Sequence, residues 1–331
     1  RRLVRRLVRR SNGPTRARTI DLAVACGLVV LAFGCGEAPT PEVVDLRPIT
    51  VAVNAPLADF AQTLGAGIVE VERPAPDGED PSLWRPDADT IAEVQRSELV
   101  LLQGPAVEPW GVSIPLPTAR TRDTTANARS RFPTGRAGTV HRHGDGPAHA
   151  HGGNADHAWL DLGIARLQAR AVRDALVAIR PEHEATIDER WRALDGELAT
   201  LRRRADEVLA EAPPMLAAHS IFDFLAHAHG LSIETVEWPP GTSLDGGLLG
   251  ELGTTAAEHG ASILLVETEL DGETRDRLAA IGLTPVRFDP LGAGDPDGRE
   301  FTERMNANLD RLAKAFASGD DAAPGDGSRE E

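Results

Sequence analysis

The sequence predicts an α/β protein of two lobes with mainly parallel sheets, joined by one long rigid helix. Three observations support this fold class. Short β-branched runs alternate with helical periods over residues 48–182, and the same alternation returns over residues 213–317. Between them, residues 183–212 carry an unbroken helical period. Strand–helix alternation is typical of parallel sheets with crossover helices, and two facing lobes of this kind form a cleft.

The first lobe is predicted over residues 48–182. Its expected strands are "ITVAVN", "GIVEVER" and "ELVLLQG", at 49–54, 67–73 and 98–104, separated by helices at 56–65 and 89–97. Residues 105–157 have a loop-like composition, apart from a possible strand at "SIPLP" (113–117). A loop of this length is either functional or disordered.

Two helices follow, at 161–179 and 183–210. In the second, apolar residues recur in steps of three and four, at Ile187, Trp191, Leu194, Leu198, Leu201, Ala205 and Leu209. That spacing places them on one face of a helix about 40 Å long, enough to cross a domain. The second lobe (213–317) repeats the strand–helix alternation, and residues 318–331 read as a disordered acidic tail.

The N-terminus has the features of an export signal. Arg-rich residues precede the apolar run "LAVACGLVVLAFGC", which ends at Cys35 and is short for a membrane span. We therefore expect a signal peptide over 1–35 with a lipobox-like end, lipidation of Cys35, and a Pro-rich tether over 36–47. Ala32 stands where a lipobox usually has Leu, so a plainly cleaved signal or an uncleaved anchor remains an alternative.

The net charge argues against nucleic acid as a partner. The formal charge is −16, and residues 1–34 contribute eight Arg and one Asp, so a chain starting at Cys35 carries −23. A protein this acidic is a poor candidate for binding nucleic acid by neutralising phosphates. It attracts cations instead.

Three polar residues occupy positions where chemistry is expected. His219 follows the apolar strand "PMLAA", Asp289 ends the strand "TPVRFD", and His157 precedes the first long helix in "DHAWLD". Each has a structural alternative: His219 could pack in a turn or the core, Asp289 could form the turn before Pro290, and His157 could be the last of a loose His tract. Imidazole and carboxylate together suit Zn²⁺, and also Mn²⁺ or Fe²⁺.

The remaining candidates lie elsewhere in the chain. Glu267 and Glu269 follow another apolar strand and could face the cleft, although solvated carboxylates are the favoured interpretation. Residues 141–151 form a His-rich loop that contains His141, His143, His149 and His151. Such a loop either collects metal weakly or is a solvated linker.

Five stretches in this order resemble one known family. They are "DPSLWRP" (80–86), the loop 141–151, "ADHAWLD" (155–161), "AHSIFDF" (218–224) and "DPLG" (289–292). Over residues 48–317 the chain resembles the periplasmic zinc- and manganese-binding lipoproteins of metal ABC importers, the cluster A-I solute-binding proteins. The resemblance implies a metal cleft between the lobes, with His157, His219 and Asp289 as ligands.

One departure concerns the ligand set. The family's first His corresponds to Ser82, and a hydroxyl is a poor Zn²⁺ ligand. Glu79 or Asp80 could supply the missing donor, a water could complete a three-ligand site, or tight binding could have been lost.

The resemblance implies a function. We expect a monomeric, membrane-anchored lipoprotein, at the periplasm or cell surface, that captures Zn²⁺ or Mn²⁺ and delivers it to an ABC permease without catalysis. The alternatives are a zinc-dependent hydrolase, since two His and a carboxylate also suit catalytic zinc, and an adhesin or scaffold that keeps the fold with a degenerate metal site.

Overall fold

The computed structural model describes residues 47–79, 84–104, 110, 114–133, 140–141, 149–150, 157–238, 241–298 and 300–320. The chain divides into two units, Arg1–Asp45 and Leu46–Glu331, and all of the described residues belong to the second. No helix in these ranges is both long and apolar enough to cross a membrane. Cys35, with the expected signal and most of the tether, lies outside the described residues.

The first lobe contains a four-stranded parallel sheet in the order β2-β1-β3-β4. Its strands are β1 (Ile49–Ala52), β2 (Glu70–Glu72), β3 (Leu99–Leu102) and β4 (Thr121–Asp123). Helices α1 (Ala55–Gly65) and α2 (Ala88–Arg96) supply the crossovers. Asn54 begins α1 because its side chain accepts a hydrogen bond from Leu57 N, which satisfies a free helix donor.

The expected strand at 113–117 is wrong where the structure describes it. Residues 114–117 form no strand, and the fourth strand lies a few residues later, at Thr121–Asp123, paired with β3. Pro115 and Pro117 explain the difference, since proline has no N–H to donate to a sheet ladder. The segment 105–157 also holds the short turn η1 (Arg129–Arg131) and two two-residue strands, β5 (Val140–His141) and β6 (His149–Ala150).

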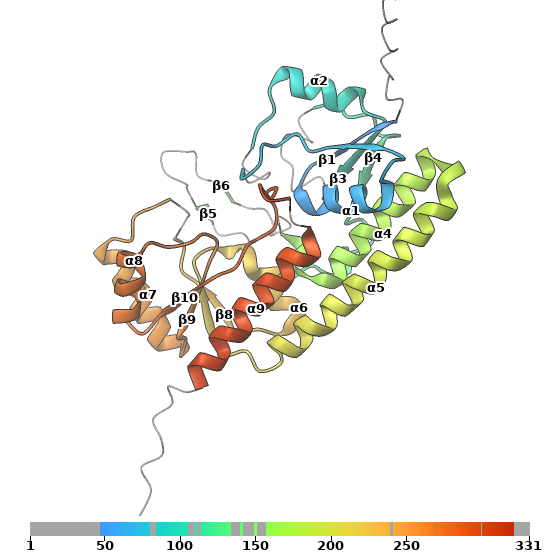
Figure 1. The fold of residues 1–331 in the computed structure, drawn as a ribbon. Coiled ribbons are helices and arrows are strands. Elements are labelled where there is room, and N and C mark those ends of the chain that lie inside the picture. Colours follow the sequence, from blue (N-terminus) through green and yellow to red (C-terminus); the bar gives the residue numbers. More distant parts are fainter. Residues whose placement is uncertain are drawn as a thin grey trace, which may run out of the picture. The chain divides into compact units, whose positions relative to one another are not determined.

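Two helices lead out of the first lobe. Helix α4 (Leu162–Ile179) is followed by the turn η3 (Pro181–His183) and by α5 (Glu184–Leu209), whose 26 residues confirm the long helix. Its buried residues are Ile187, Leu194, Leu198, Leu201, Ala205 and Leu209, so the predicted apolar face is the packed one, except that Trp191 is only partly buried. Helices α4 and α5 pack side by side, and the ion pair Arg166–Asp195 joins them (Figure 1).

The second lobe repeats the topology of the first. Its strands are β7 (Met215–Ala217), β8 (Ile233–Thr235), β9 (Ile263–Val266) and β10 (Thr284–Arg287). They form a parallel sheet in the order β10-β9-β7-β8. Written in reverse, this order is β8-β7-β9-β10. If the strands of each lobe are numbered along the chain, both sheets then have the order second, first, third, fourth. The direction of winding therefore reverses between β1 and β3, and again between β7 and β9.

The helices of the second lobe are η4 (Ser220–Phe222), α6 (Asp223–His229), α7 (Gly246–His259), α8 (Gly272–Ala280) and α9 (Phe301–Asp320). Helix α9 lies against α5 (Figure 1). It continues to Asp320, so the expected tail boundary at 318 is corrected. No proline interrupts the helix before Pro324, and Ser318 Oγ donates to Lys314 O within it.

One hydrophobic core runs through both lobes. A single cluster of buried residues includes β1 and β3 of the first sheet, α4 and α5, and Met215, Phe288 and Leu309 of the second lobe. Two aromatic pairs lie within it: Phe60 on α1 meets Phe301 on α9 with ring centroids 5.2 Å apart, and Phe132 meets Phe224 at the same distance. A smaller cluster fills the space under α7 and α8.

Candidate metal centre

Polar residues follow all four strands of the second sheet. Asp289 follows β10, Glu267 follows β9, His219 follows β7 and Glu237 follows β8, each within two residues of the strand end. Because parallel strands end at the same edge, these side chains share the carboxyl edge where open α/β sheets bind ligands.

His219 lies between two carboxylates. Its Nδ1 is 3.2 Å from Glu267 Oε1, and its Nε2 is 3.9 Å from Glu237 Oε2. The side chains of His219 and Glu267 are 13% and 16% exposed. Glu267 Oε1 and Glu237 Oε2 are buried and have no hydrogen-bond partner in the described part of the chain. Buried carboxylate oxygens of this kind are costly unless a cation or a donor approaches them.

Asp289 is held by its own lobe. Its Oδ2 accepts Arg304 Nε at 2.9 Å, and its Oδ1 accepts Arg304 Nη2 and Leu291 N, both at 2.9 Å. The bond to Leu291 N shows that the turn-forming role weighed from the sequence is real. A carboxylate oxygen has two lone pairs, so Oδ2 keeps one for a further partner.

The loop after Asp289 is strained. Leu291 has φ 67°, and it is the one non-glycine residue in the described ranges with positive φ. Its side chain is fully buried, which holds it in this conformation. Such strain is typical of ligand-binding sites.

His157 belongs to the first lobe but contacts this loop. It precedes the turn η2 (Ala158–Leu160), is 5% exposed, and its ring lies 5.1 Å from that of Trp159. A Cβ added to Gly292 would lie 3.7 Å from His157 Nε2. Trp159 Nε1 donates to Pro290 O at 2.8 Å, which fixes the contact. His157 Nδ1 is buried and has no hydrogen-bond partner among the described residues.

The three predicted ligands thus lie in two separate groups. His157 lies against the Asp289 loop, and His219 lies beside Glu267 and Glu237. Within the described ranges, no group of three or more His, Cys, Asp or Glu is arranged to hold a metal ion. The ligand set His157, His219 and Asp289 therefore remains a prediction.

The other predicted donors are less informative. Glu79 lies in an exposed turn, where its N–H bonds Pro76 O. Asp80, Ser82, His143 and His151 lie outside the described residues. His141 and His149 face each other in the antiparallel register of β5 and β6, so the backbone of the His-rich segment includes a strand pair that the sequence did not suggest.

Sequence reasoning underrated Glu267 and did not single out Glu237. Glu267 was expected to be solvated, but its side chain is 16% exposed and lies beside His219, so that expectation is wrong. Glu269 is 70% exposed, as expected. Both Glu267 and Glu237 follow a strand, which is the feature that identified His219 and Asp289 as candidates in the sequence.

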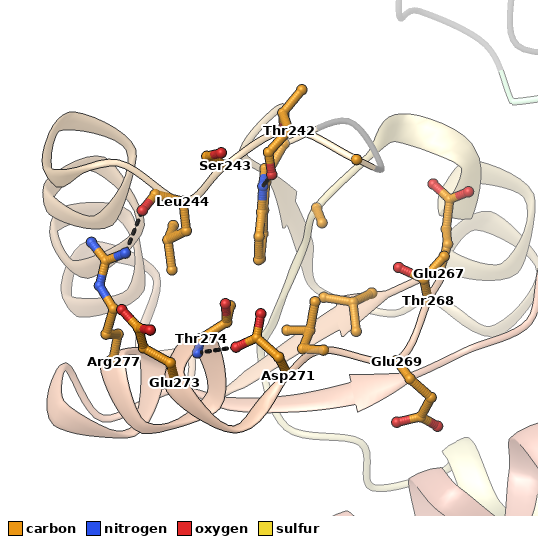
Figure 2. Close-up of a pocket in the computed structure, with 15 residues that line it drawn as sticks. Thr242, Ser243, Leu244, Glu267, Thr268, Glu269, Asp271, Glu273, Thr274 and Arg277 are labelled. Atoms are coloured by element: carbon orange, nitrogen blue, oxygen red, sulfur yellow. Dashed lines mark hydrogen bonds between the residues drawn. The ribbon is translucent and has the colours of Figure 1, made fainter.

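A cavity of about 480 Å³ adjoins this edge of the sheet, lined by residues 241–244 before α7, by residues 267–271 after β9 and by α8. Figure 2 shows Glu267 and Thr268 at one side of the cavity and Glu273 and Arg277 at the other. Arg277 Nη1 donates to Leu244 O, and Asp271 caps α8 through Thr274 N. The carboxylate edge is thus reached from a hollow, acidic surface.

A half-buried ionisable group lies near Arg304. Burial raises the pKa of Asp59, on α1, to about 7, against the opposing attraction of Arg304. Asp59 also accepts a hydrogen bond from Phe301 N–H, at the start of α9. The two lobes are therefore in contact through a carboxylate whose charge changes near neutral pH.

Two parallel α/β sheets, a long helix between them, and imidazole and carboxylate groups at strand ends define a class of solute-binding protein. The chain belongs to the family described as zinc-uptake complex component A, periplasmic, which it matches over residues 50–315. This confirms the resemblance found in the sequence. The family is one of transport components and not of enzymes, so the hydrolase alternative is set aside.

Named relatives agree with this assignment. The chain is 23% identical over 266 residues to the high-affinity zinc uptake system protein ZnuA of Yersinia pestis, covering 72% of this chain and 81% of the relative. It is 20% identical over 305 residues to the manganese ABC transporter substrate-binding lipoprotein PsaA of Streptococcus pneumoniae, covering 87% and 96%. The crystal structure of the metal-dependent lipoprotein YcdH from Bacillus subtilis shares the fold, with a TM-score of 0.68 at 18% identity, over 81% of this chain and 98% of that one.

Proposed function

We propose that this chain captures Zn²⁺ outside the cytoplasm and delivers it to the permease of an ABC importer. His157 from the first lobe and His219 and Asp289 from the second are the proposed ligands. The supporting observation is the position of His157: its buried ring lies against the loop that begins at Asp289, with Nδ1 unpartnered among the described residues. Deprotonated imidazole and carboxylate are the donors that Zn²⁺ prefers when no thiolate is present.

Mn²⁺ is the second candidate ion. Carboxylate donors suit Mn²⁺ better than imidazole does, and this sheet edge is rich in them. A competition titration between Zn²⁺ and Mn²⁺ shows which ion the protein binds more tightly.

The remaining parts of the proposal concern location. A lipid on Cys35 would hold the protein at the outer face of a membrane, as a monomer whose partners are the permease and its ATPase. Support comes from the apolar run ending at Cys35 and from a relative described as a lipoprotein. Mass spectrometry of the mature chain tests lipidation, and Cys35→Ser should release the protein from membranes.

The test of metal capture is a titration of residues 36–331 with Zn²⁺ against a calibrated chelator. Three proteins are compared: the wild type, a variant lacking 141–151, and His219→Ala. We expect one tight site that survives removal of the loop and is lost in His219→Ala, because the loop supplies no cleft ligand.

The opposite pattern is also informative. Weak, multiple binding that disappears with the loop would mean that the cleft does not hold zinc. The adhesin or scaffold function would then replace the transport function. The loss of the metal site would be explained by Ser82, whose hydroxyl replaces a His ligand.

A further inference from the structure

We propose that Glu267 is a direct ligand of the bound metal ion, so that the site contains two imidazoles and two carboxylates. This inference rests on the proposed function, since it adds a donor to the same site. The Glu267 carboxylate would also compensate for the poor Zn²⁺ ligand at Ser82, which corresponds to the family's first His.

The topology of the second sheet places Glu267 at its ligand-binding point. In an open parallel sheet, ligands bind where the winding reverses, in the crevice beyond the strand ends. In the second lobe that point lies between β7 and β9, and His219 and Glu267 follow these two strands. Glu237 follows β8, on the far side of His219.

The equivalent point in the first lobe is occupied differently. There Asn54, after β1, donates its amide to Gln103, after β3, at 2.8 Å in a buried hydrogen bond. Two neutral amides thus close the first crevice, whereas an imidazole and a carboxylate face each other in the second. Only the second pair has the imidazole and carboxylate donors that Zn²⁺ prefers.

The spacing of the strands also favours Glu267 as a ligand. Strands are about 4.8 Å apart, so an ion shared by His219, after β7, and Asp289, after β10, would lie beyond the end of β9, the strand between them. Glu267 follows that strand. An ion bound by the two predicted ligands therefore has the Glu267 carboxylate as its nearest neighbour along the edge.

The distance between His219 and Glu267 suits two ligands of one ion. His219 Nδ1 and Glu267 Oε1 are 3.2 Å apart. Two donors bound to one tetrahedral Zn²⁺ at about 2.1 Å are separated by about 3.4 Å, so the pair needs little movement to share an ion. Glu267 Oε1 is buried and has no hydrogen-bond partner in the described part of the chain, and an ion would satisfy it.

Glu269 provides a matched control. It lies two residues further along the same segment, carries the same charge, and is 70% exposed. Both residues line the same cavity, and their side chains point in opposite directions at its margin (Figure 2). A general loss of negative charge would affect both variants alike, whereas loss of a ligand affects only Glu267.

The experiment measures Zn²⁺ affinity of the wild type, Glu267→Gln, Glu267→Asp and Glu269→Gln by chelator competition. We expect Glu267→Gln to weaken binding by about 100-fold or more, and Glu269→Gln by less than about threefold. Glu267→Asp should fall between them, because it keeps the charge on a shorter side chain. Thermal unfolding in excess chelator checks that each variant is folded.

A spectrum separates a ligand from a residue that only orients His219. The Co²⁺-loaded wild type and Glu267→Gln should differ in the position and intensity of their visible bands, because a donor has changed. Weaker binding with an unchanged Co²⁺ spectrum would overturn the proposal. So would tight binding by Glu267→Gln equal to that of Glu269→Gln, which leaves the transport function intact. A wild type without a tight site would instead refute the proposed function itself.

Discussion

Asp59 is a single residue that couples pH to the contact between the lobes. Its pKa in the folded protein is about 7, against an ordinary value of 3.8, because burial disfavours the charged form. The folded protein therefore binds the Asp59 proton more tightly than the unfolded chain does. This stability is fully present below about pH 4 and is lost as pH rises towards 7.

Asp59→Asn should stabilise the protein at pH 8, because Asn cannot ionise and still accepts the Phe301 N–H. The gain is at most about 4 kcal/mol in the free energy of unfolding, and it shrinks at pH 5. Urea unfolding at both pH values measures it. The exposed Asp276→Asn serves as the control and should change little at either pH. An Asp59→Asn gain that is the same at both pH values contradicts the assignment.

At the scale of elements, the sequence was most informative where a pattern was long. The 26 residues of α5 carry several turns of one periodicity, so the helix could be predicted with its packed face. The fourth strand of the first sheet could not, because the three residues Thr121–Asp123 carry no pattern of their own. Their pairing with β3 is a tertiary contact.

The candidate site could be predicted from the sequence only in part. The positions of His219 and Asp289 after apolar strands were visible in the sequence. The burial of Glu267 was not, because it depends on the neighbouring strand β7, which is distant along the chain. The Arg304 contact with Asp289 also joins residues of separate elements, and no local rule finds it.

Helix α5 offers a test of its own contribution. Gly196 is exposed within it, and an added Cβ would meet no atom within 4 Å. Gly196→Ala should raise the free energy of unfolding by about 0.5–1 kcal/mol, because glycine costs more backbone entropy in a helix. Gly65→Ala in α1 is the contrasting variant: its Cβ would lie 2.5 Å from Val69 Cγ2, so it should destabilise. Chemical denaturation compares the two, and equal effects would contradict the packing argument.

At the scale of the whole molecule, the two sheets share one core. The main hydrophobic cluster runs from Val51 to Phe288 and Leu312 through α4 and α5, without a break between the lobes. Neither lobe can lose its packing without exposing apolar surface of the other.

Unfolding of residues 46–331 should therefore be a single cooperative transition. Scanning calorimetry should give a van 't Hoff enthalpy equal to the calorimetric enthalpy. The chain has five Trp, of which Trp110 lies in the first lobe and Trp238 in the second. A variant that keeps only Trp110 and a variant that keeps only Trp238, with the other four changed to Phe, therefore follow each lobe separately by fluorescence. Two resolved transitions, or midpoints that differ between the lobes, would show that the core is divided.

The carboxyl edge of the second sheet has a consequence for how this fold diversifies. Each of its four strands is followed, within two residues, by one ionisable residue, and the strands themselves are held by packing elsewhere. A single codon change at Glu237, His219, Glu267 or Asp289 can thus alter the chemistry of the edge while the scaffold persists. Proteins of this fold can thus change their preferred metal ion through few substitutions. This agrees with two relatives, 23% and 20% identical to this chain, of which one is named for zinc and the other for manganese.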